Sequence, residues 1–156
     1  MPVGKSWNSP NLVANRRYSK TVIPPTIINT LFSTPLSIVP ASPGYFYIPR
    51  FIHFQKDSGA AFTLNASTRF EVKVGGVVCG YVDLVGFLDQ TTQLTAYCDS
   101  PGSNISRYTA FTAANITAFT NVPITLSGTV ANTSGGSGNL SIAVIFDNWP
   151  VVFGMD

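Results

Sequence analysis

Charged side chains are scarce in this sequence. Lys, Arg, Asp and Glu make up 10% of its 156 residues, while 45% of the residues are hydrophobic. An ordinary soluble domain carries about 25% charged residues. Burying neutral hydroxyl and amide groups against a partner costs less than burying charges, and a freely soluble monomer normally carries more charge than this. The composition therefore favours a subunit of an assembly.

Histidine, paired acids and long apolar runs are also scarce. His53 is the only histidine, so neither a catalytic triad nor a metal site has a second imidazole to use. The acidic residues are scattered singly, whereas glycosidases need two facing carboxyl groups. No run approaches the ~18 apolar residues of a membrane helix, and the start has no secretory pattern. We expect no enzymatic activity, no cofactor, no metal and no membrane insertion.

Two cysteines, Cys79 and Cys98, are expected on neighbouring strands. In a protein made inside a cell, such cysteines are most often small buried side chains with reduced thiols. A disulfide between them is the alternative.

Basic residues are concentrated before the first acidic residue, Asp57. Six of the nine lie there: Lys5, Arg16, Arg17, Lys20, Arg50 and Lys56. A locally basic segment is attracted to acidic surfaces. Nucleic-acid-binding segments usually interleave denser Lys and Arg with aromatic residues, so nucleic acid is not an expected partner.

The first 43 residues contain seven prolines and a run of apolar side chains without charge between Lys20 and Arg50. Disordered tails are poor in apolar residues, and leaving these in water would forgo on the order of 10 kcal/mol. We expect an extended Pro-rich N-terminal arm over residues 1–43, long enough to reach a neighbouring subunit. Its docking residues are predicted to be Ile27, Ile28, Leu31, Phe32, Leu36 and Ile38. In the alternative, this segment forms an irregular first strand and loops that close a sheet of its own domain.

From Gly44 onward, alternating apolar residues and turn signals recur every 8 to 12 residues, which is typical of a sandwich or barrel. Pro49 predicts an edge strand or a bulge, and Gly75-Gly76 predicts a hairpin turn. The predicted strands are 45–56, 61–64, 69–74, 77–84, 92–98, 106–111, 115–120, 124–130 and 139–147. The expected fold is all-β, a single jelly-roll-like β-sandwich over residues 44–156.

Three segments carry a resemblance to a known group: Phe46-Tyr-Ile-Pro49, Gly86-Phe-Leu-Asp-Gln90 and Ser137-Gly-Asn-Leu-Ser-Ile-Ala-Val144. Together they resemble the small jelly-roll virion proteins of tailed bacteriophages, of the capsid decoration or cement type, similar in outline to tumour-necrosis-factor-like trimers. The resemblance covers roughly residues 44–148 and leaves the arm unmatched. It implies a homotrimer in the virion, made in the host cytoplasm, that binds the major capsid protein or other virion proteins and reinforces the capsid surface.

Self-association is expected through one face of the strand at 45–56, with the candidate residues Tyr45, Tyr47, Phe51 and His53. Ile142, Val144 and Phe146 either join this surface or form the sandwich core. One alternative is a sugar-binding adhesin or a tail or fibre head domain. It would use Tyr45, Tyr47, Tyr81 and Tyr97 for stacking and the loops Asp83–Asp89 and Asp99–Asn104 for a calcium or sugar site. A further alternative is a small icosahedral coat protein whose basic arm faces nucleic acid.

Overall fold

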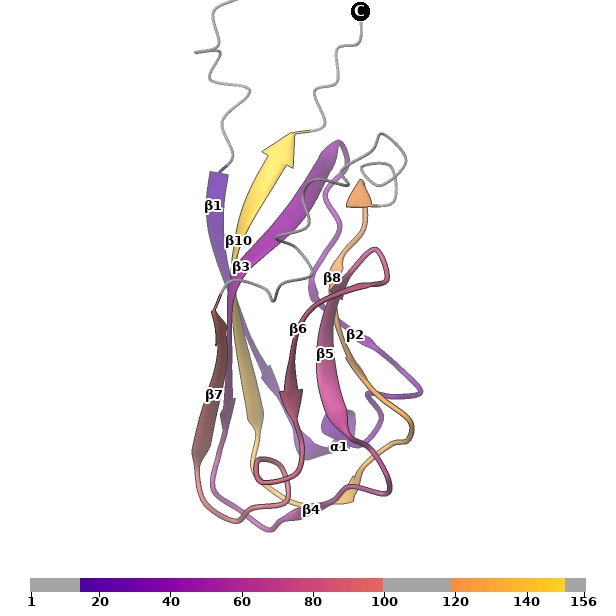
Figure 1. The fold of residues 1–156 in the computed structure, drawn as a ribbon, viewed down its shortest axis with the longest axis vertical. Coiled ribbons are helices and arrows are strands. Elements are labelled where there is room, and N and C mark those ends of the chain that lie inside the picture. Colours follow the sequence, from indigo (N-terminus) through magenta and orange to yellow (C-terminus); the bar gives the residue numbers. More distant parts are fainter. Residues whose placement is uncertain (1–14, 100–118, 151–156) are drawn as a thin grey trace, which may run out of the picture.

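The computed structural model of the chain describes residues 15–99 and 119–150. The predicted strand at 106–111, most of the one at 115–120, and residues 1–14 of the expected arm lie outside these ranges. The described residues form two four-stranded sheets that pack face to face, and a third, two-stranded sheet lies at one end of the sandwich (Figure 1).

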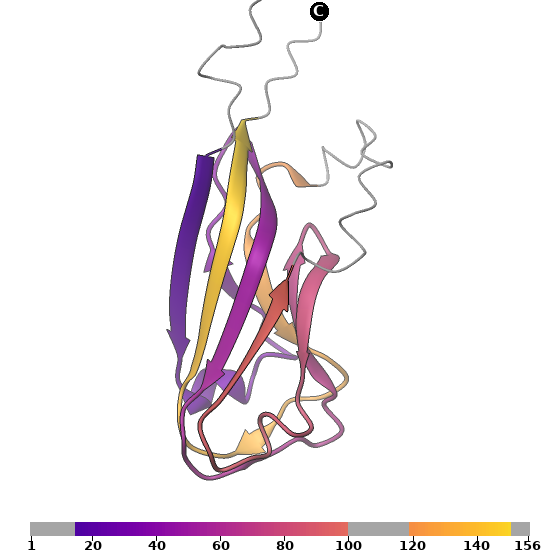
Figure 2. The same ribbon diagram turned by 60° about the vertical axis from the view of Figure 1, so that its left-hand side comes forward.

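Every strand pair in the structure is antiparallel. Sheet A has the spatial order β1 (Asn15–Ile23), β10 (Leu140–Pro150), β3 (Tyr45–Lys56) and β7 (Leu94–Asp99). Sheet B has the order β2 (Leu36–Val39), β8 (Ile124–Gly128), β5 (Arg69–Val74) and β6 (Val77–Asp83). The small sheet pairs β4 (Phe62–Thr63) with β9 (Ser134–Gly135). Figure 2 shows sheets A and B side by side.

The strand order of the two large sheets is that of a jelly roll. With β4 and β9 set aside, the first strand pairs with the last: β1 with β10, β2 with β8, β3 with β7, and β5 with β6. These pairs make one long hairpin, and the further pairs β10 with β3 and β8 with β5 roll it into two sheets. Two interlocked Greek keys of this kind define the jelly roll. The predicted all-β jelly-roll sandwich is confirmed.

Alternation along the strands places the core between sheets A and B. Phe70, Val72 and Val74 of β5 are buried, as their spacing predicted. On β10, the core residues are Leu140, Ile142, Val144 and Phe146. Each such side chain contributes about 1.5 to 3 kcal/mol by burial. Ile142, Val144 and Phe146 thus belong to the sandwich core and are not available as an interaction surface.

The N-terminal segment differs from the expected arm. Residues 15–39 supply β1 to sheet A and β2 to sheet B, so the sandwich begins well before Gly44. Pro24 and Pro25 break neither strand, because they fall between them, at the start of α1 (Pro25–Ile28). A helix tolerates proline at its first position because the N–H there has no partner within the helix. The alternative expectation, in which this segment forms a first strand of its own domain, therefore matches the structure of the single chain.

The predicted docking residues of the arm divide into two groups. Ile28, Leu31 and Ile38 lie in the core of the same chain, and Leu36 packs against it, whereas Ile27 and Phe32 are exposed. Asn132 holds this connection, because its side-chain oxygen accepts hydrogen bonds from the backbone N–H groups of Phe32 and Ser33, each at 3.1 Å. The apolar residues therefore find their burial within the chain, and exchange of the segment between copies stays a prediction.

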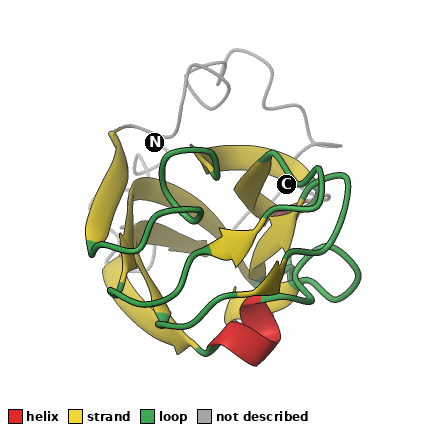
Figure 3. Ribbon diagram, turned by 90° about the horizontal axis from the view of Figure 1, so that it is seen from below, coloured by secondary structure: helices red, strands yellow, loops and turns green. Residues whose placement is uncertain are grey.

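Lys56 is the last residue of β3. Figure 3 views the sandwich from below, with α1 in red. The Lys56 side chain is fully buried, and its Nζ donates to the carbonyl oxygens of Asp57 (3.1 Å) and Thr92 (3.5 Å). Burial lowers the pKa of the Lys56 amine. Lys56 thus ties two loops together in place of an apolar core residue.

Candidate interaction surface

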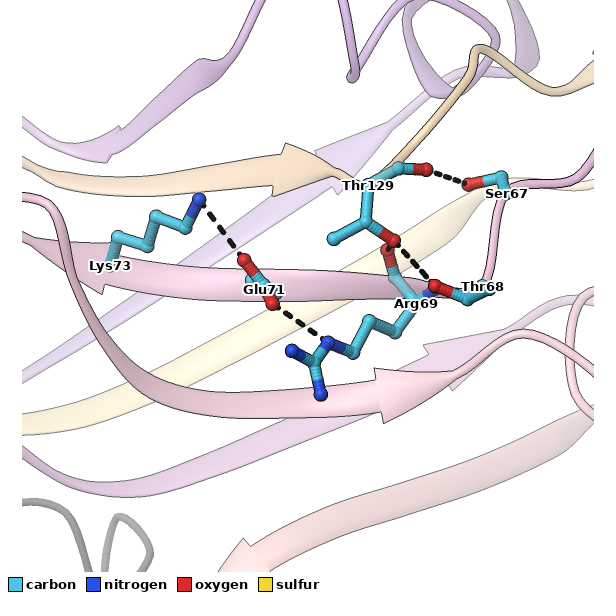
Figure 4. Close-up of polar contacts among 6 residues, drawn as sticks. All are labelled: Ser67, Thr68, Arg69, Glu71, Lys73 and Thr129. Atoms are coloured by element: carbon cyan, nitrogen blue, oxygen red, sulfur yellow. Dashed lines mark hydrogen bonds and ion pairs between the residues drawn. The ribbon is translucent and has the colours of Figure 1, made fainter.

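The outer face of sheet B carries charges that are paired with one another. The Glu71 carboxylate is buried, accepts a hydrogen bond from Arg69 Nε at 2.7 Å and forms an ion pair with Lys73 Nζ at 3.0 Å (Figure 4). The Arg69 guanidinium also lies 4.8 Å from the centre of the Tyr81 ring. A cation over an aromatic face is attracted by the ring quadrupole. Arg69 and Lys73 thus share the Glu71 carboxylate, and this group is left with one excess positive charge.

Hydroxyl groups continue this network beyond the start of β5. Ser67 Oγ donates to the Thr129 carbonyl at 3.1 Å, and the hydroxyls of Thr68 and Thr129 are 2.8 Å apart (Figure 4). Thr129 Oγ1 also accepts from the Arg69 backbone N–H and donates to its carbonyl, both at 3.1 Å. These polar groups are used within the chain, which leaves little for a partner.

The outer face of sheet A is different, because aromatic and aliphatic residues gather on it. Leu140, Ile142, Val144 and Phe146 point inward, so Ala143 and Ile145 point outward. The register places Tyr18 and Phe51 on either side of Ile145, and it places His53 and Tyr97 in the row through Ala143. We call these six residues the aromatic face: Tyr18, Phe51, His53, Tyr97, Ala143 and Ile145.

Two of the aromatic rings are largely in solvent. Tyr18 and Tyr97 are each 65% exposed. The Phe51 and Tyr97 rings stack with 6.0 Å between centroids and 24° between planes. Rings fixed in this way lose little conformational entropy when they are covered, which is why tyrosine is enriched in protein interfaces.

An ion triad lies next to the aromatic face on the same side of sheet A. The buried Asp147 carboxylate accepts from Arg16 Nε at 3.1 Å and from Arg50 Nε at 2.7 Å. Burial by itself raises the pKa of this carboxyl, but hydrogen bonds from both arginines and their charges lower it further, so the net shift is downward. Two guanidinium groups share one carboxylate, and the triad is left with one excess positive charge.

A β-bulge separates the four predicted self-association residues. Phe51 lies opposite Ile145 and Pro49 lies opposite Phe146, so Arg50 is the extra residue. Of the two alternatives that Pro49 predicted, an edge strand or a bulge, the structure shows the bulge. It exchanges the two faces of the strand between its halves. Phe51 and His53 face outward, whereas Tyr47 lies in the core with Tyr45 on the same side. The expectation that all four share one face is therefore corrected.

Tyr47 belongs to the core by its contacts. It packs edge-on against Phe146 with 5.1 Å between ring centroids, and its hydroxyl donates to the Pro40 carbonyl at 2.7 Å. Burial raises the pKa of the Tyr47 hydroxyl, with an opposing hydrogen bond to Ser42. Tyr47 fixes the packing of β3 on β10 and is not available to a partner.

Sequence reasoning missed Tyr18 and Ile145 as surface residues and gave Tyr97 only a sugar-stacking role. Tyr18 was placed in the arm, although Arg16, Tyr18, Lys20 and Val22 have the period of two that marks one face of a strand. The outward position of Ile145 follows from the alternation on β10, once the even-numbered residues from Leu140 to Phe146 are assigned to the core.

The tyrosines proposed for sugar stacking do not lie together. Tyr47 is in the core, Tyr81 is on sheet B and Tyr97 is on sheet A. In the Asp83–Asp89 loop, the Asp89 carboxylate accepts from the Gly86 N–H at 2.7 Å and from the Gln90 amide at 3.0 Å, as a turn cap does. The Asp99–Asn104 loop lies outside the described residues beyond Asp99.

Two further features bear on the kind of site. Within residues 15–99 and 119–150, no three His, Cys, Asp or Glu side chains lie close enough to hold a metal ion together. In the same ranges, no helix has the length and apolarity of a membrane span, and α1 has four residues. The aromatic face is the candidate site that the described residues provide.

No protein-family model matches the chain, and no curated protein sequence matches it. Among solved structures, the chain is similar to one described as the cyanophage Pam1 capsid asymmetric unit, with a TM-score of 0.45 and 12% sequence identity. That alignment covers 94% of this chain and 99% of the other. The assignment to the jelly roll comes from the strand order above and not from this likeness.

Proposed function

We propose that this chain is a non-enzymatic virion structural protein, a capsid decoration or cement subunit that associates with copies of itself through the aromatic face. The contrast between the two outer faces carries the proposal. On sheet B, Arg69, Glu71 and Lys73 are paired with one another, whereas sheet A exposes Tyr18 and Tyr97 around uncharged residues, with Lys20 at the edge of that face. An exposed aromatic cluster on one face is typical of a protein–protein contact.

The outer face of sheet A, on which the aromatic face lies, is large enough to contact a second copy of the chain. Four strands spaced by about 4.8 Å, with about nine residues each at about 3.3 Å per residue, cover about 600 Å² in projection. A standard interface buries about 800 Å² of accessible surface on each partner, and side chains make the accessible area larger than the projection. A copy of the same chain is the occupant we propose, and a homotrimer is the expected assembly.

The virion setting rests on the low charge of the chain and on the fold together. Jelly rolls build viral coats and lectins, but a fold alone assigns no function. A lectin would need a shared stacking site, and the tyrosines considered for one are dispersed over the core and both sheets. A charge-poor subunit with one aromatic face fits a lattice component that binds the major capsid protein or other virion proteins.

Virus particles assembled without this chain provide the test. Purified full-length protein added to such particles should co-sediment with them at a fixed stoichiometry, and electron microscopy should place it on the outer surface. Particles that never take up the protein would overturn the proposal. Closed shells formed by the purified chain alone would overturn it in favour of a coat protein.

A further inference from the structure

One of the two edges of sheet A is formed by β1, a strand of nine residues (Figure 2). It pairs with β10 along its whole length, from Asn15 opposite Asn148 to Ile23 opposite Leu140. Among the strands that the structure describes, none pairs with its other side. Most of its residues are exposed, and an open edge presents unpaired N–H and C=O groups to which another strand can add.

Positive charge is concentrated along this edge. Arg16, Arg17 and Lys20 lie on β1, and Arg50 joins them through the shared carboxylate of Asp147. Four basic residues against one acid leave three positive charges here, whereas the whole chain carries a net charge of +2. Arg17 and Lys20 form no ion pair with any described residue. The edge thus combines open backbone groups with unneutralised charge.

We propose that the β1 edge binds an extended acidic segment of another protein, which adds to sheet A as a further strand. This goes beyond the proposed function, because it uses a different surface and a different partner. The segment would place carboxylates opposite Arg17 and Lys20. These two residues are three positions apart, so their side chains project to opposite sides of the strand.

The same charges argue against β1 pairing with β1 of a second copy. An antiparallel pair centred on Tyr18 would set Arg16 opposite Lys20 of the other copy, and one centred on Arg17 would set Arg17 opposite itself. Like charges directly opposite each other destabilise a strand pair. Nucleic acid also carries negative charge, but it offers no backbone that can continue the hydrogen-bond ladder, so an acidic polypeptide is the partner that uses both features.

A synthetic peptide of three Thr-Glu-Val repeats, blocked at both ends, is a suitable probe because it spaces its carboxylates by three residues. Calorimetry on the full-length protein should show binding that weakens with added salt. The double substitution Arg17→Glu/Lys20→Glu should weaken it about tenfold or more, because two attractions become repulsions. The matched control Arg17→Lys/Lys20→Arg keeps both charges and should bind as the wild type does.

Two further ligands separate strand addition from simple charge attraction. The same peptide N-methylated at alternate residues keeps its carboxylates but cannot form the ladder, and it should not bind. Equal binding of both peptides, or no binding of the first, overturns the proposal. Tighter binding of a thymidine oligonucleotide, lost in the same double variant, overturns it in favour of nucleic acid. The oligomeric mass of the Glu variant should match the wild type, which keeps this test separate from self-association.

Discussion

Phe51 of β3 stacks on Tyr97 of β7, and both rings lie on the outer side of sheet A. Such a ring pair contributes about 0.5 to 1.5 kcal/mol beyond the burial of its area. Tyr97 nevertheless leaves most of its surface in solvent. The stack therefore holds an apolar surface in place before any partner covers it.

The core packing between sheets A and B can be tested at Gly80. A Cβ added to Gly80 would come within 2.7 Å of Ile52 Cδ1 on the opposite sheet. Gly80→Ala should therefore lower the free energy of unfolding by about 1 to 3 kcal/mol, as overpacking does. Urea denaturation of the purified variant measures this change.

The companion variant Ile52→Val removes the clashing methyl group. The double variant Gly80→Ala/Ile52→Val should be more stable than the sum of the two single effects predicts. Strict additivity would show that the two residues do not press against each other.

Asp147 should make the stability depend on pH at the acid end. Its pKa lies below the ordinary value because the two arginines outweigh the effect of burial. A carboxyl with a lowered folded-state pKa stabilises the protein above its unfolded pKa of about 3.9, and this is lost as pH falls through the folded-state pKa.

Asp147→Asn should therefore lower the free energy of unfolding by about 1 to 2 kcal/mol at pH 7, an amount reduced by the exposure of both arginines. The difference in unfolding free energy between variant and wild type should disappear as the pH falls below about 4. Thermal unfolding at several pH values measures it, with the exposed Asp83→Asn as control. A difference that stays constant down to the lowest pH would contradict the assigned ion triad.

Val130 adopts a left-handed backbone conformation, with a φ of 69°, at the centre of a turn in which the Ala131 N–H donates to the Thr129 carbonyl at 2.8 Å. A β-branched residue is strained there, and glycine is not. Val130→Gly should stabilise the protein by about 1 kcal/mol. Val85→Gly, at another exposed valine without a positive φ, should instead destabilise it slightly. Equal losses in both variants would show that Val130 is unstrained.

Cys79 and Cys98 should differ in reactivity. Both are thiols in the structure, and burial raises the pKa of the Cys79 thiol to about 12. Because the thiolate is the reactive form, Cys79 should resist maleimide until the protein unfolds. Cys98 is only partly buried and should label in the native state. Mass spectrometry of timed samples measures both rates, and equal labelling would show that the core around Cys79 opens readily.

The sequence was informative where alternation was strong. Arg69–Val74 separates apolar from charged positions, and Gly75-Gly76 supplies two residues with positive φ, as a tight hairpin turn requires. On β10, the spacing of Leu140, Ile142 and Val144 identified a buried face. The number of predicted strands then favoured a jelly-roll sandwich, whereas the strand order came from the structure.

The pattern failed at β1 and at the bulge in β3. The inward side of β1 carries Arg17, Ser19 and Thr21, and Ile23 is its buried residue, so an edge strand looked like part of an arm. Pro49 indicated a bulge but not which residue would be extra, and this decides whether Tyr47 or Phe51 faces the core. Both failures concern positions whose burial is set by distant strands.

The most direct test of the account is the oligomeric mass of the full-length protein by analytical ultracentrifugation, alone and with Tyr18→Ser/Tyr97→Ser. The wild type should sediment as an oligomer and the double variant as a folded monomer. Val85→Ser, which changes a similarly exposed apolar residue away from the aromatic face, should stay oligomeric. A monomeric wild type, or a double variant that assembles as the wild type does, would contradict the claim that copies of this chain meet through the aromatic face.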